Sequence, residues 1–221
     1  WSFWHSVLNH TEAFVERIRN TPVSVKEWQR QRSIYHARPR RIVELGFAAF
    51  YLNRCNRSGI MSTGGVIGGL DQTGKWKIDA RYNPTELIRR IERLAALREK
   101  IRICRLDAIE FLRTDILQEK DRSRYFIYLD PPYYVKGSRL YMNYYEPKDH
   151  AALARFLRRI KHVNWLVTYD NTPEIRELYE WREITDFQLQ YSAASAKQGS
   201  EIMIPSPGLS LPIERLRVQS A

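Results

Sequence analysis

The sequence predicts an α/β protein whose N-terminal half is helical and basic. After residue 100, short runs of apolar, β-branched and aromatic residues alternate with amphipathic helical patterns. The expected strands are 101–106, 125–129, 165–169, 187–191 and 201–204. The expected helices between them are 108–117, 150–162 and 173–179. Such alternation favours a sheet covered by helices.

The first hundred residues give helical patterns instead. Apolar residues recur at helical spacing through residues 1–20, and Thr21-Pro22 ends that pattern. Residues 42–52 form a short apolar helix pattern, and residues 84–100 form a second clear helix with basic residues on one face. A glycine-rich polar stretch, 58–76, lies between these two helices.

Composition narrows the classes of function. The 221 residues include 36 Lys and Arg against 25 Asp and Glu, a net charge of +11. This excess predicts a polyanionic partner, either nucleic acid or an anionic membrane surface. No apolar run reaches the roughly 18 residues that a membrane span needs. The two cysteines, Cys55 and Cys104, exclude a disulfide scaffold and a cysteine-rich zinc site, and they suit a reducing cytoplasm. The five histidines show no metal-ligand spacing, so we expect no metal site.

The most informative motif is Asp130-Pro131-Pro132-Tyr133, which follows the apolar run 125–129. Two prolines cannot donate to a sheet ladder, so the strand must end at this point. Open α/β sheets bind ligands at the carboxyl ends of their strands. The motif therefore predicts a carboxylate, a stiff turn and an aromatic face at a substrate site. The structural alternative is a strand-terminating turn with an Asx-type hydrogen bond.

Together with segments on both sides, this motif resembles the D12 class of N6-adenine DNA methyltransferases, the Dam-like family. The resemblance covers nearly the whole chain, in the family's order. The other segments that carry it are Asn53–Gly59, Gly68-Gly69, Lys75-Trp76, Asp79–Asn83, Asp107-Ala108, Phe111-Leu112, His150, Leu153, Tyr169–Asn171, Glu201-Ile202 and Ile204.

The resemblance implies a Rossmann-like, S-adenosylmethionine-dependent methyltransferase sheet with a mostly helical target-recognition insert. Residues 1–21 would be a helix of the catalytic domain, residues 22–100 the recognition region, and residues 101–221 the catalytic domain that holds the motif. The cofactor would be S-adenosylmethionine, bound by Asp107, Ala108 and Asp130, with Asp107 on its adenine amine. Asp107 is equally well placed to cap the expected helix 108–117.

The chemistry of the motif can be argued from its residues. The exocyclic amine of adenine is a poor nucleophile because its lone pair is delocalised into the ring. Asp130 and the carbonyl of Pro131 can each accept one N6 proton, which favours a pyramidal nitrogen and stabilises its growing positive charge. Tyr133 offers a face for the base, which must be flipped out of the duplex. We expect Asp130, Pro131, Pro132 and Tyr133 to form the catalytic site.

Basic residues are the candidate contacts to double-stranded DNA. Within the basic, aromatic stretch 25–41, we expect the arginines to bind backbone phosphates. Asn53, Arg54 and Arg57 match a family signature, and a DNA-facing role competes with a solvated helix end. Lys136 and Arg139 follow the motif in a polar, aromatic loop that could close over the flipped nucleotide. The arginines predicted in the basic stretch are Arg30, Arg38, Arg40 and Arg41.

The sequence also departs from the family. Family members carry an upstream lysine-containing segment and a glycine-rich strand-to-helix turn that hold the cofactor, and neither is found here. The glycines at 64–69 are no substitute, because they follow no expected strand. We therefore expect the chain, which starts at Trp1, to be part of a longer protein and to hold only part of the cofactor site.

Two alternative functions remain open at this point. One is a non-catalytic DNA-binding remnant of such an enzyme. The other is an amino-methyltransferase that acts on cytosine N4 or on RNA, because Asp130 and Tyr133 would serve either ring. We expect a cytoplasmic, nucleoid-associated monomer of bacterial or phage type, with no membrane partner and with a cognate restriction endonuclease as a candidate partner. The sequence leaves the target site open.

Overall fold

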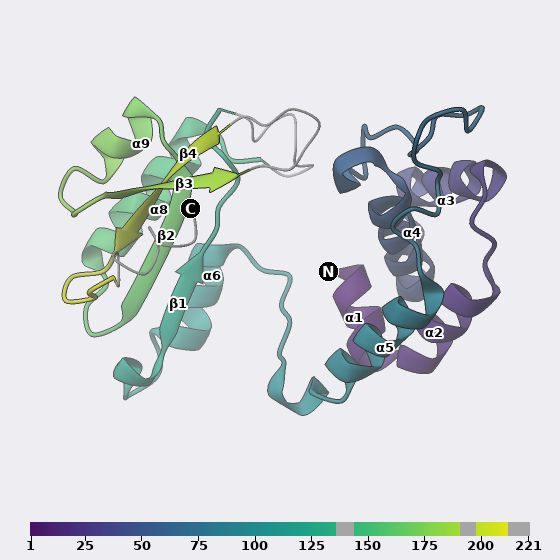
Figure 1. The fold of residues 1–221 in the computed structure, drawn as a ribbon. Coiled ribbons are helices and arrows are strands. Elements are labelled where there is room, and N and C mark those ends of the chain that lie inside the picture. Colours follow the sequence, from purple (N-terminus) through teal and green to yellow (C-terminus); the bar gives the residue numbers. More distant parts are fainter. Residues whose placement is uncertain (136–143, 191–197, 212–221) are drawn as a thin grey trace. The chain divides into compact units, whose positions relative to one another are not determined.

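The computed structural model describes residues 1–135, 144–190 and 198–211, and the chain divides into two units, Trp1–Arg105 and Leu106–Ala221 (Figure 1). We call the first the helical unit and the second the sheet unit. Their boundary lies close to residue 100, where the sequence changes character. Helices and a four-stranded mixed sheet confirm the expected mixed α/β class. None of the helices in the described residues combines the length and the apolar character needed to cross a membrane.

The helical unit follows its sequence signals closely. Ser24 caps α3 by accepting a hydrogen bond from the Glu27 amide, and Asn83 caps α5, which has Pro84 in its first turn. The basic, aromatic stretch forms α3, and the expected helix 84–100 ends earlier, followed by a short 3-10 turn. The elements are α1 Ser2–Asn9, α2 Thr11–Asn20, α3 Val25–Ala37, α4 Ile42–Cys55, η1 Arg57–Gly59, α5 Pro84–Ala95 and η2 Arg98–Lys100.

The expectation of one helix over residues 1–20 is wrong. The backbone leaves helical geometry at His10 (φ −137°, ψ 42°), which separates α1 from α2. The break lets both short helices bury an apolar face, with Val7 on α1 and Phe14 on α2 inside one core. In the structure α1 packs against α4 and α5, and α2 packs against α5. The assignment of residues 1–21 to the catalytic domain stays a prediction.

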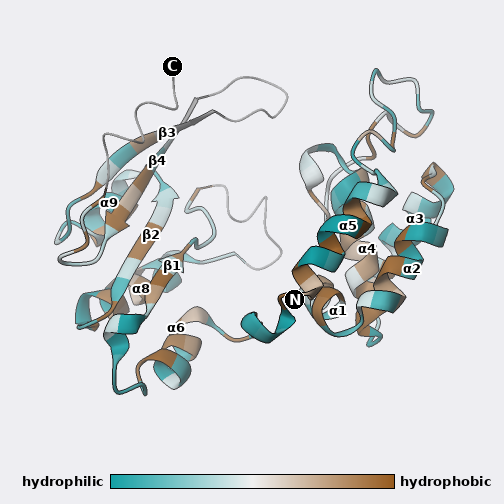
Figure 2. Cartoon of the chain, turned by 60° about the horizontal axis from the view of Figure 1, so that its bottom comes forward, coloured by the Kyte–Doolittle hydropathy of each residue, from teal (hydrophilic) through white to brown (hydrophobic). Residues whose placement is uncertain are grey.

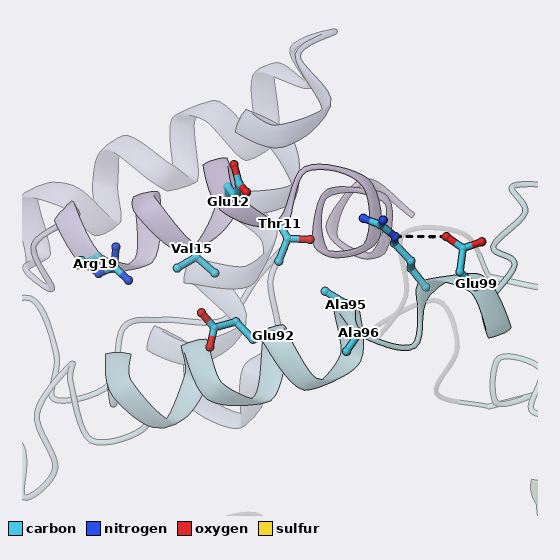
Figure 3. A pocket seen from close by; sticks show the side chains of 9 residues that line it. Thr11, Glu12, Val15, Arg19, Glu92, Ala95, Ala96 and Glu99 are labelled. Atoms are coloured by element: carbon cyan, nitrogen blue, oxygen red, sulfur yellow. Dashed lines mark hydrogen bonds and ion pairs between the residues drawn. The ribbon is translucent and has the colours of Figure 1, made fainter.

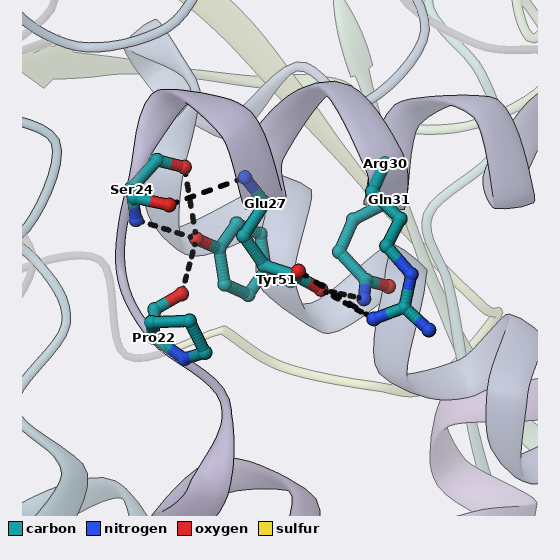
Figure 4. Close-up of polar contacts among 6 residues, drawn as sticks. All are labelled: Pro22, Ser24, Glu27, Arg30, Gln31 and Tyr51. Carbon is teal, nitrogen blue, oxygen red and sulfur yellow. Dashed lines mark hydrogen bonds and ion pairs between the residues drawn. The ribbon is translucent and has the colours of Figure 1, made fainter.

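Aromatic rings form most of the core of the helical unit. Phe14, Phe47 and Phe50 meet edge-on or tilted, with ring centroids 5.5–6.2 Å apart. The buried Tyr51 of α4 reaches the start of α3, where its hydroxyl donates to the Pro22 carbonyl at 3.1 Å and accepts from the Ser24 amide at 3.2 Å (Figure 4). These bonds tie the end of the loop before α3 to the core.

The sheet unit has strand order β1-β2-β4-β3. β1 and β2 are parallel, and β4 runs antiparallel to both β2 and β3. Glu146 and Asp149 form a capping box and Pro147 occupies the first turn of α8, so that helix starts and ends three residues earlier than expected. The elements are α6 Ala108–Phe111, a π turn Leu112–Ile116, η4 Arg122–Arg124, β1 Phe126–Leu129, α8 Pro147–Arg159, β2 Asn164–Asp170, α9 Pro173–Leu178, β3 Thr185–Gln190 and β4 Gln198–Pro205.

One face of the sheet packs against α8 and α9. Trp165, Val167 and Ile202 are fully buried there, with Leu157 of α8 and Ile175 of α9 in the same core. The apolar second half of β4 and the largely hydrophilic α3 contrast in Figure 2. Side chains alternate along each strand, so residues with the other parity point to the opposite face.

The expected strand at 101–106 is not formed in the described part of the chain. These residues follow η2 in a non-regular conformation, and the Ile101 amide bonds only locally, to the Arg98 carbonyl at 3.1 Å. Apolar composition alone does not make a strand, because the backbone also needs a partner for its ladder of hydrogen bonds. The other four expected strands are present, with ends shifted by up to three residues, although residue 191 lies outside the described residues.

Candidate functional site

The Asp130–Tyr133 motif lies at the carboxyl end of β1. Leu129, the last residue of β1, pairs with Val167 of the parallel strand β2, so the two strands end at the same edge of the sheet. The ladder stops at Pro131 and Pro132, which have no amide hydrogen to donate. Asp130 is exposed, whereas the next three residues are half-buried. The motif carboxylate is therefore open to solvent at the edge where α/β sheets bind their ligands.

Side chains from two other strands hold the motif in place. Asp170, at the end of β2, accepts hydrogen bonds from the Tyr134 amide at 2.9 Å and from the Val135 amide at 3.2 Å. The hydroxyl of Tyr133 donates to Glu201 Oε1 of β4 at 2.8 Å. Asp170 and Glu201 are register partners, so both braces come from one point of the sheet. The turn after β1 is thus fixed by charge-assisted hydrogen bonds.

Asp130 itself has a neighbour on β2. The Thr168 hydroxyl donates to Asp130 Oδ1 at 3.3 Å and also contacts the Tyr128 hydroxyl at 2.9 Å. Thr168 is buried, so it limits the directions in which the carboxylate can turn. An exposed carboxylate held from one side can accept a donor from a ligand on its other side.

An aromatic cluster supports the residue after the motif. His150 of α8 is fully buried, with ring centroids 5.0 Å from Tyr134 and 5.2 Å from Tyr145. Its Nδ1 shares a hydrogen bond with the Tyr169 hydroxyl at 3.0 Å. Burial lowers the pKa of His150, against the opposing effect of Asp170 and Asp149. A neutral imidazole therefore packs under Tyr134 and adds to its support.

Asp107 caps α6. Its Oδ1 accepts from the Ile109 amide at 2.9 Å and from the Glu110 amide at 3.2 Å, and Ala108 begins the helix. The structure thus shows the capping role that competed with cofactor binding. Asp107 also lines a pocket of about 700 Å³ between α6 and α8, together with Tyr145 and Asp149. Burial raises the pKa of Tyr145, and the carboxylates of Asp107 and Asp149 raise it further.

The predicted phosphate-binding arginines of the basic stretch are all exposed. Arg30 is paired with Glu27 at 3.2 Å, and Glu27 also accepts from Gln31 at 2.6 Å (Figure 4). Arg38 ends α3 in a left-handed conformation (φ 49°). Arg40 and Arg41 lie in the turn before α4.

The next candidate DNA contacts, Asn53, Arg54 and Arg57, lie at two different places in the helical unit. Asn53 and Arg54, both half-buried, lie in the last turn of α4, and Arg54 donates from Nε to the Asn53 side chain at 3.1 Å. Arg57 is exposed and lines another pocket, beside Trp28. Lys136 and Arg139 lie outside the described residues.

Sequence reasoning did not select the residues that brace the motif. Thr168, Asp170 and Glu201 lie far from Asp130 in sequence, and only pairing of the strands brings them to it. Two of them were within segments that carry the family resemblance, which is the one signal that pointed to them. Their contact with the motif was not foreseeable from spacing.

The fold and the motif define an α/β protein with a candidate ligand site at its strand ends, at an Asp-Pro-Pro-Tyr turn. The sequence profile of the D12 class N6 adenine-specific DNA methyltransferases matches residues 3–193, and the chain belongs to this family. The resemblance seen in the sequence is thereby confirmed. The family consists of DNA adenine N6-methyltransferases, which typically use S-adenosylmethionine and act on DNA. No curated protein sequence matches the chain.

Proposed function

We propose that this chain carries the catalytic site of an S-adenosylmethionine-dependent methyltransferase that modifies the N6 amine of a flipped adenine in duplex DNA. The single observation that supports this most strongly is the Asp130–Tyr133 turn: its exposed Asp130 lies at the carboxyl ends of β1 and β2, and hydrogen bonds to Asp170 and Glu201 hold the backbone and Tyr133 beside it. The family match supports the reaction class.

In this proposal, Asp130 and the carbonyl of Pro131 accept the two N6 protons of the extruded adenine. The two acceptors draw the nitrogen toward pyramidal geometry and stabilise the positive charge that develops on it. Pro131 and Pro132 restrict the backbone, so the carbonyl is positioned before the base arrives. Tyr133, fixed through its hydroxyl, presents a ring on which the base stacks, and such stacking is worth about 1–3 kcal/mol per base.

The cofactor supplies a methyl group already activated on a sulfonium, so position and charge are what the protein adds. Asp107, Ala108 and Asp130 are the proposed cofactor residues. Among the described residues, the pocket at Asp107 also contains Glu110 and Asp149, against the single cation Arg113, and this excess of carboxylates suits a positively charged ligand. The Asp107 oxygen that caps α6 keeps the carboxylate in a fixed orientation.

We further propose that the sheet is the described part of a Rossmann-like methyltransferase sheet, with residues 22–100 as the DNA-recognition region. Two features of β1 agree with a larger sheet. Phe126 and Tyr128 of this edge strand are 58% and 56% exposed. Large exposed apolar side chains on an edge strand favour a further covering element. The residues proposed to contact DNA are Arg30, Arg38, Arg40, Arg41, Asn53, Arg54, Arg57, Lys136 and Arg139.

The test is product analysis. Labelled S-adenosylmethionine and unmethylated duplex DNA are incubated with the protein, both as residues 1–221 and together with whatever the same reading frame encodes before Trp1. The DNA is then digested to nucleosides. We expect labelled N6-methyladenine, and none from an Asp130→Ala variant. Labelled N4-methylcytosine would refute adenine as the substrate. Salt-sensitive DNA binding without methyl transfer, in both residues 1–221 and the extended protein, would favour a non-catalytic remnant.

A further inference from the structure

A pocket at the start of α5 gathers three arginines from separate parts of the helical unit. Its volume is about 620 Å³, and Arg54 reaches it from the end of α4, Arg81 from the loop before α5, and Arg90 from α5 itself. Asn83 and Pro84, the cap and first residue of α5, also line it. The N-terminus of a helix adds a partial positive charge to such a site.

The arginines are oriented by neighbouring groups. Arg54 donates to the Asn53 side chain, whose own amide donates to the Gly59 carbonyl at 3.2 Å. Gly59 has a φ of +71°, and a Cβ there would lie 2.9 Å from the Asn53 side-chain nitrogen. Arg81 donates to the Asn56 carbonyl at the long distance of 3.5 Å. Each contact leaves other guanidinium N–H groups available for a ligand.

The charges of this pocket do not balance. Asp79 and Glu86 are its acidic residues, and Glu86 is shared between Arg90, at 2.6 Å, and Arg89, at 2.8 Å. Arg54 and Arg81 form no ion pair with any residue that the structure describes. Burial lowers the pKa of Arg54, and the nearby Arg81 and Arg90 lower it further. Like charges held together in this way are relieved by an anion.

A neighbouring pocket of the same unit shows the opposite balance. It lies between α2 and α5, with a volume of about 680 Å³ (Figure 3). Its three carboxylates, Glu12, Glu92 and Glu99, outnumber Arg19 and Arg98, and Arg98 is paired with Glu99 at 3.3 Å. A basic overall composition therefore does not make every hollow of this unit suitable for an anion.

We propose that Arg54, Arg81 and Arg90 bind a backbone phosphate of the DNA substrate in this pocket. The inference rests on the proposed function, because it takes DNA as the ligand, and it adds a phosphate site to the contacts proposed for the basic, aromatic stretch 25–41. Guanidinium groups bind phosphate oxygens through paired N–H groups, which fixes position as well as affinity. Such a contact would orient the helical unit on the duplex without reading its sequence.

The test compares the salt dependence of duplex binding among single variants of the chain. Arg81→Gln and Arg90→Gln each remove a pocket arginine. Arg89→Gln is the matched control, since Arg89 lies beside Arg90 on α5 and pairs with the same Glu86 but does not line the pocket. We expect the slope of log affinity against log salt to become shallower in each of these two variants, by about 0.9 where the contact with the phosphate is lost altogether. Arg89→Gln should keep the parental slope, and the losses should be equal on duplexes of any sequence.

The inference would be overturned if Arg81→Gln and Arg90→Gln had the same slope as the parent. It would also be overturned if Arg89→Gln changed the slope as much as the two pocket variants do. A second arm titrates inorganic phosphate: binding that Arg81→Gln abolishes, with an unchanged DNA slope, would assign the pocket to a free anion and overturn the DNA assignment. Methyl transfer by the parent is measured on the same samples. If the parent transfers methyl groups normally and the slopes are unchanged, only the phosphate site in the pocket is refuted. If the parent shows no DNA binding and no methyl transfer, the proposed function is refuted as well.

Discussion

The helical unit and the sheet unit hold their polar groups in different ways. In the helical unit, most cationic side chains lie on exposed faces, and their partners are near in sequence, as with Arg30 and Glu27 or Arg90 and Glu86. In the sheet unit, the polar groups around Asp130 come from three strands. The hydrogen bonds from Tyr134 to Asp170 and from Tyr133 to Glu201 span 36 and 68 residues of sequence.

This contrast has a consequence for substitution. Exposed ion pairs contribute about 0–1 kcal/mol, so single changes in the charges of the helical unit should leave its fold intact. The strand-end braces instead fix backbone amides beside the proposed reacting group, where a small displacement is costly. We therefore expect changes in the sheet unit to act on the rate, and changes in helical-unit charge to act on DNA affinity.

Among the substitutions outside the Asp130–Tyr133 motif, the largest expected effect on the rate is that of Asp170→Ala. The variant loses the acceptor for two backbone amides, Tyr134 and Val135, and frees the turn that contains Tyr133. Hydrogen bonds to charged groups contribute about 1.5–3 kcal/mol each, so we expect kcat to fall by roughly 100-fold. Single-turnover methyl transfer measures this.

Asp186→Ala is the control, because Asp186 is an exposed carboxylate of β3 that pairs with Arg176 and not with the motif. It should keep kcat close to the parental value. A similar loss in both variants would mean that the sheet, and not the brace, was damaged.

A smaller effect, on stability, is expected for Gly46→Ala in α4. A Cβ at this position would lie 2.6 Å from the Ser2 carbonyl oxygen and 2.7 Å from Ser6 Oγ, both in α1. The overlap should lower the free energy of unfolding by about 1–3 kcal/mol, although alanine is the better helix former by about 1 kcal/mol. Urea unfolding followed by near-ultraviolet circular dichroism measures the change.

Gly65→Ala is the matched control, because a Cβ there meets nothing within 4 Å. It should be close to neutral. Stabilisation by Gly46→Ala would show that α1 does not pack on α4 as described.

Tyr133→Phe should have a weaker effect on the rate. The substitution keeps the ring for stacking but removes the donor to the buried Glu201. We expect a decrease in kcat on the order of tenfold, with KM for DNA nearly unchanged. Tyr133→Leu also removes the stacking face, so its KM should rise as well. A parental kcat in Tyr133→Phe would show that the hydroxyl does not position the ring.

The smallest expected effect is the pH dependence of the sheet unit. Because the folded-state pKa of His150 lies below its unfolded value of about 6.5, the unfolded chain binds the proton more tightly. The contribution of His150 to stability is present above pH 6.5 and is lost as the pH falls below it. Urea unfolding between pH 7.5 and 5.5 should show this loss, and His150→Gln should reduce it. An NMR titration that gives His150 a pKa above 6.5 would contradict the sign.

The sequence was sufficient to predict those features that depend on neighbouring residues. Prolines at Pro84 and Pro173 and the caps at Asn83 and Thr172 mark where α5 and α9 start. The end of β1 follows from two consecutive prolines. Local patterns could not predict the break at His10, because it depends on how α1 and α2 pack. They also could not reject a strand at 101–106, because a strand forms only where another strand is available to pair with its backbone.

In the candidate site, too, some features follow from neighbouring residues and others depend on how distant segments pack. The exposed Asp130 turn could be placed at a strand end from its own tetrapeptide, since proline chemistry is local. The contribution of Asp170 depends on β1 and β2 being parallel neighbours, and that of Glu201 on the antiparallel register of β4. The convergence of Arg54, Arg81 and Arg90 likewise depends on the loop that brings Arg81 back to α4.

The most direct measurement is a comparison of Asp130→Asn with the parent in single-turnover methyl transfer, with duplex affinity determined on the same samples. Asparagine keeps the size of the side chain but removes the negative charge that would stabilise the reacting nitrogen. We predict a rate about 100-fold to 1000-fold lower, with duplex affinity unchanged. Transfer by Asp130→Asn at the parental rate would contradict the role of this carboxylate and the assignment of the site.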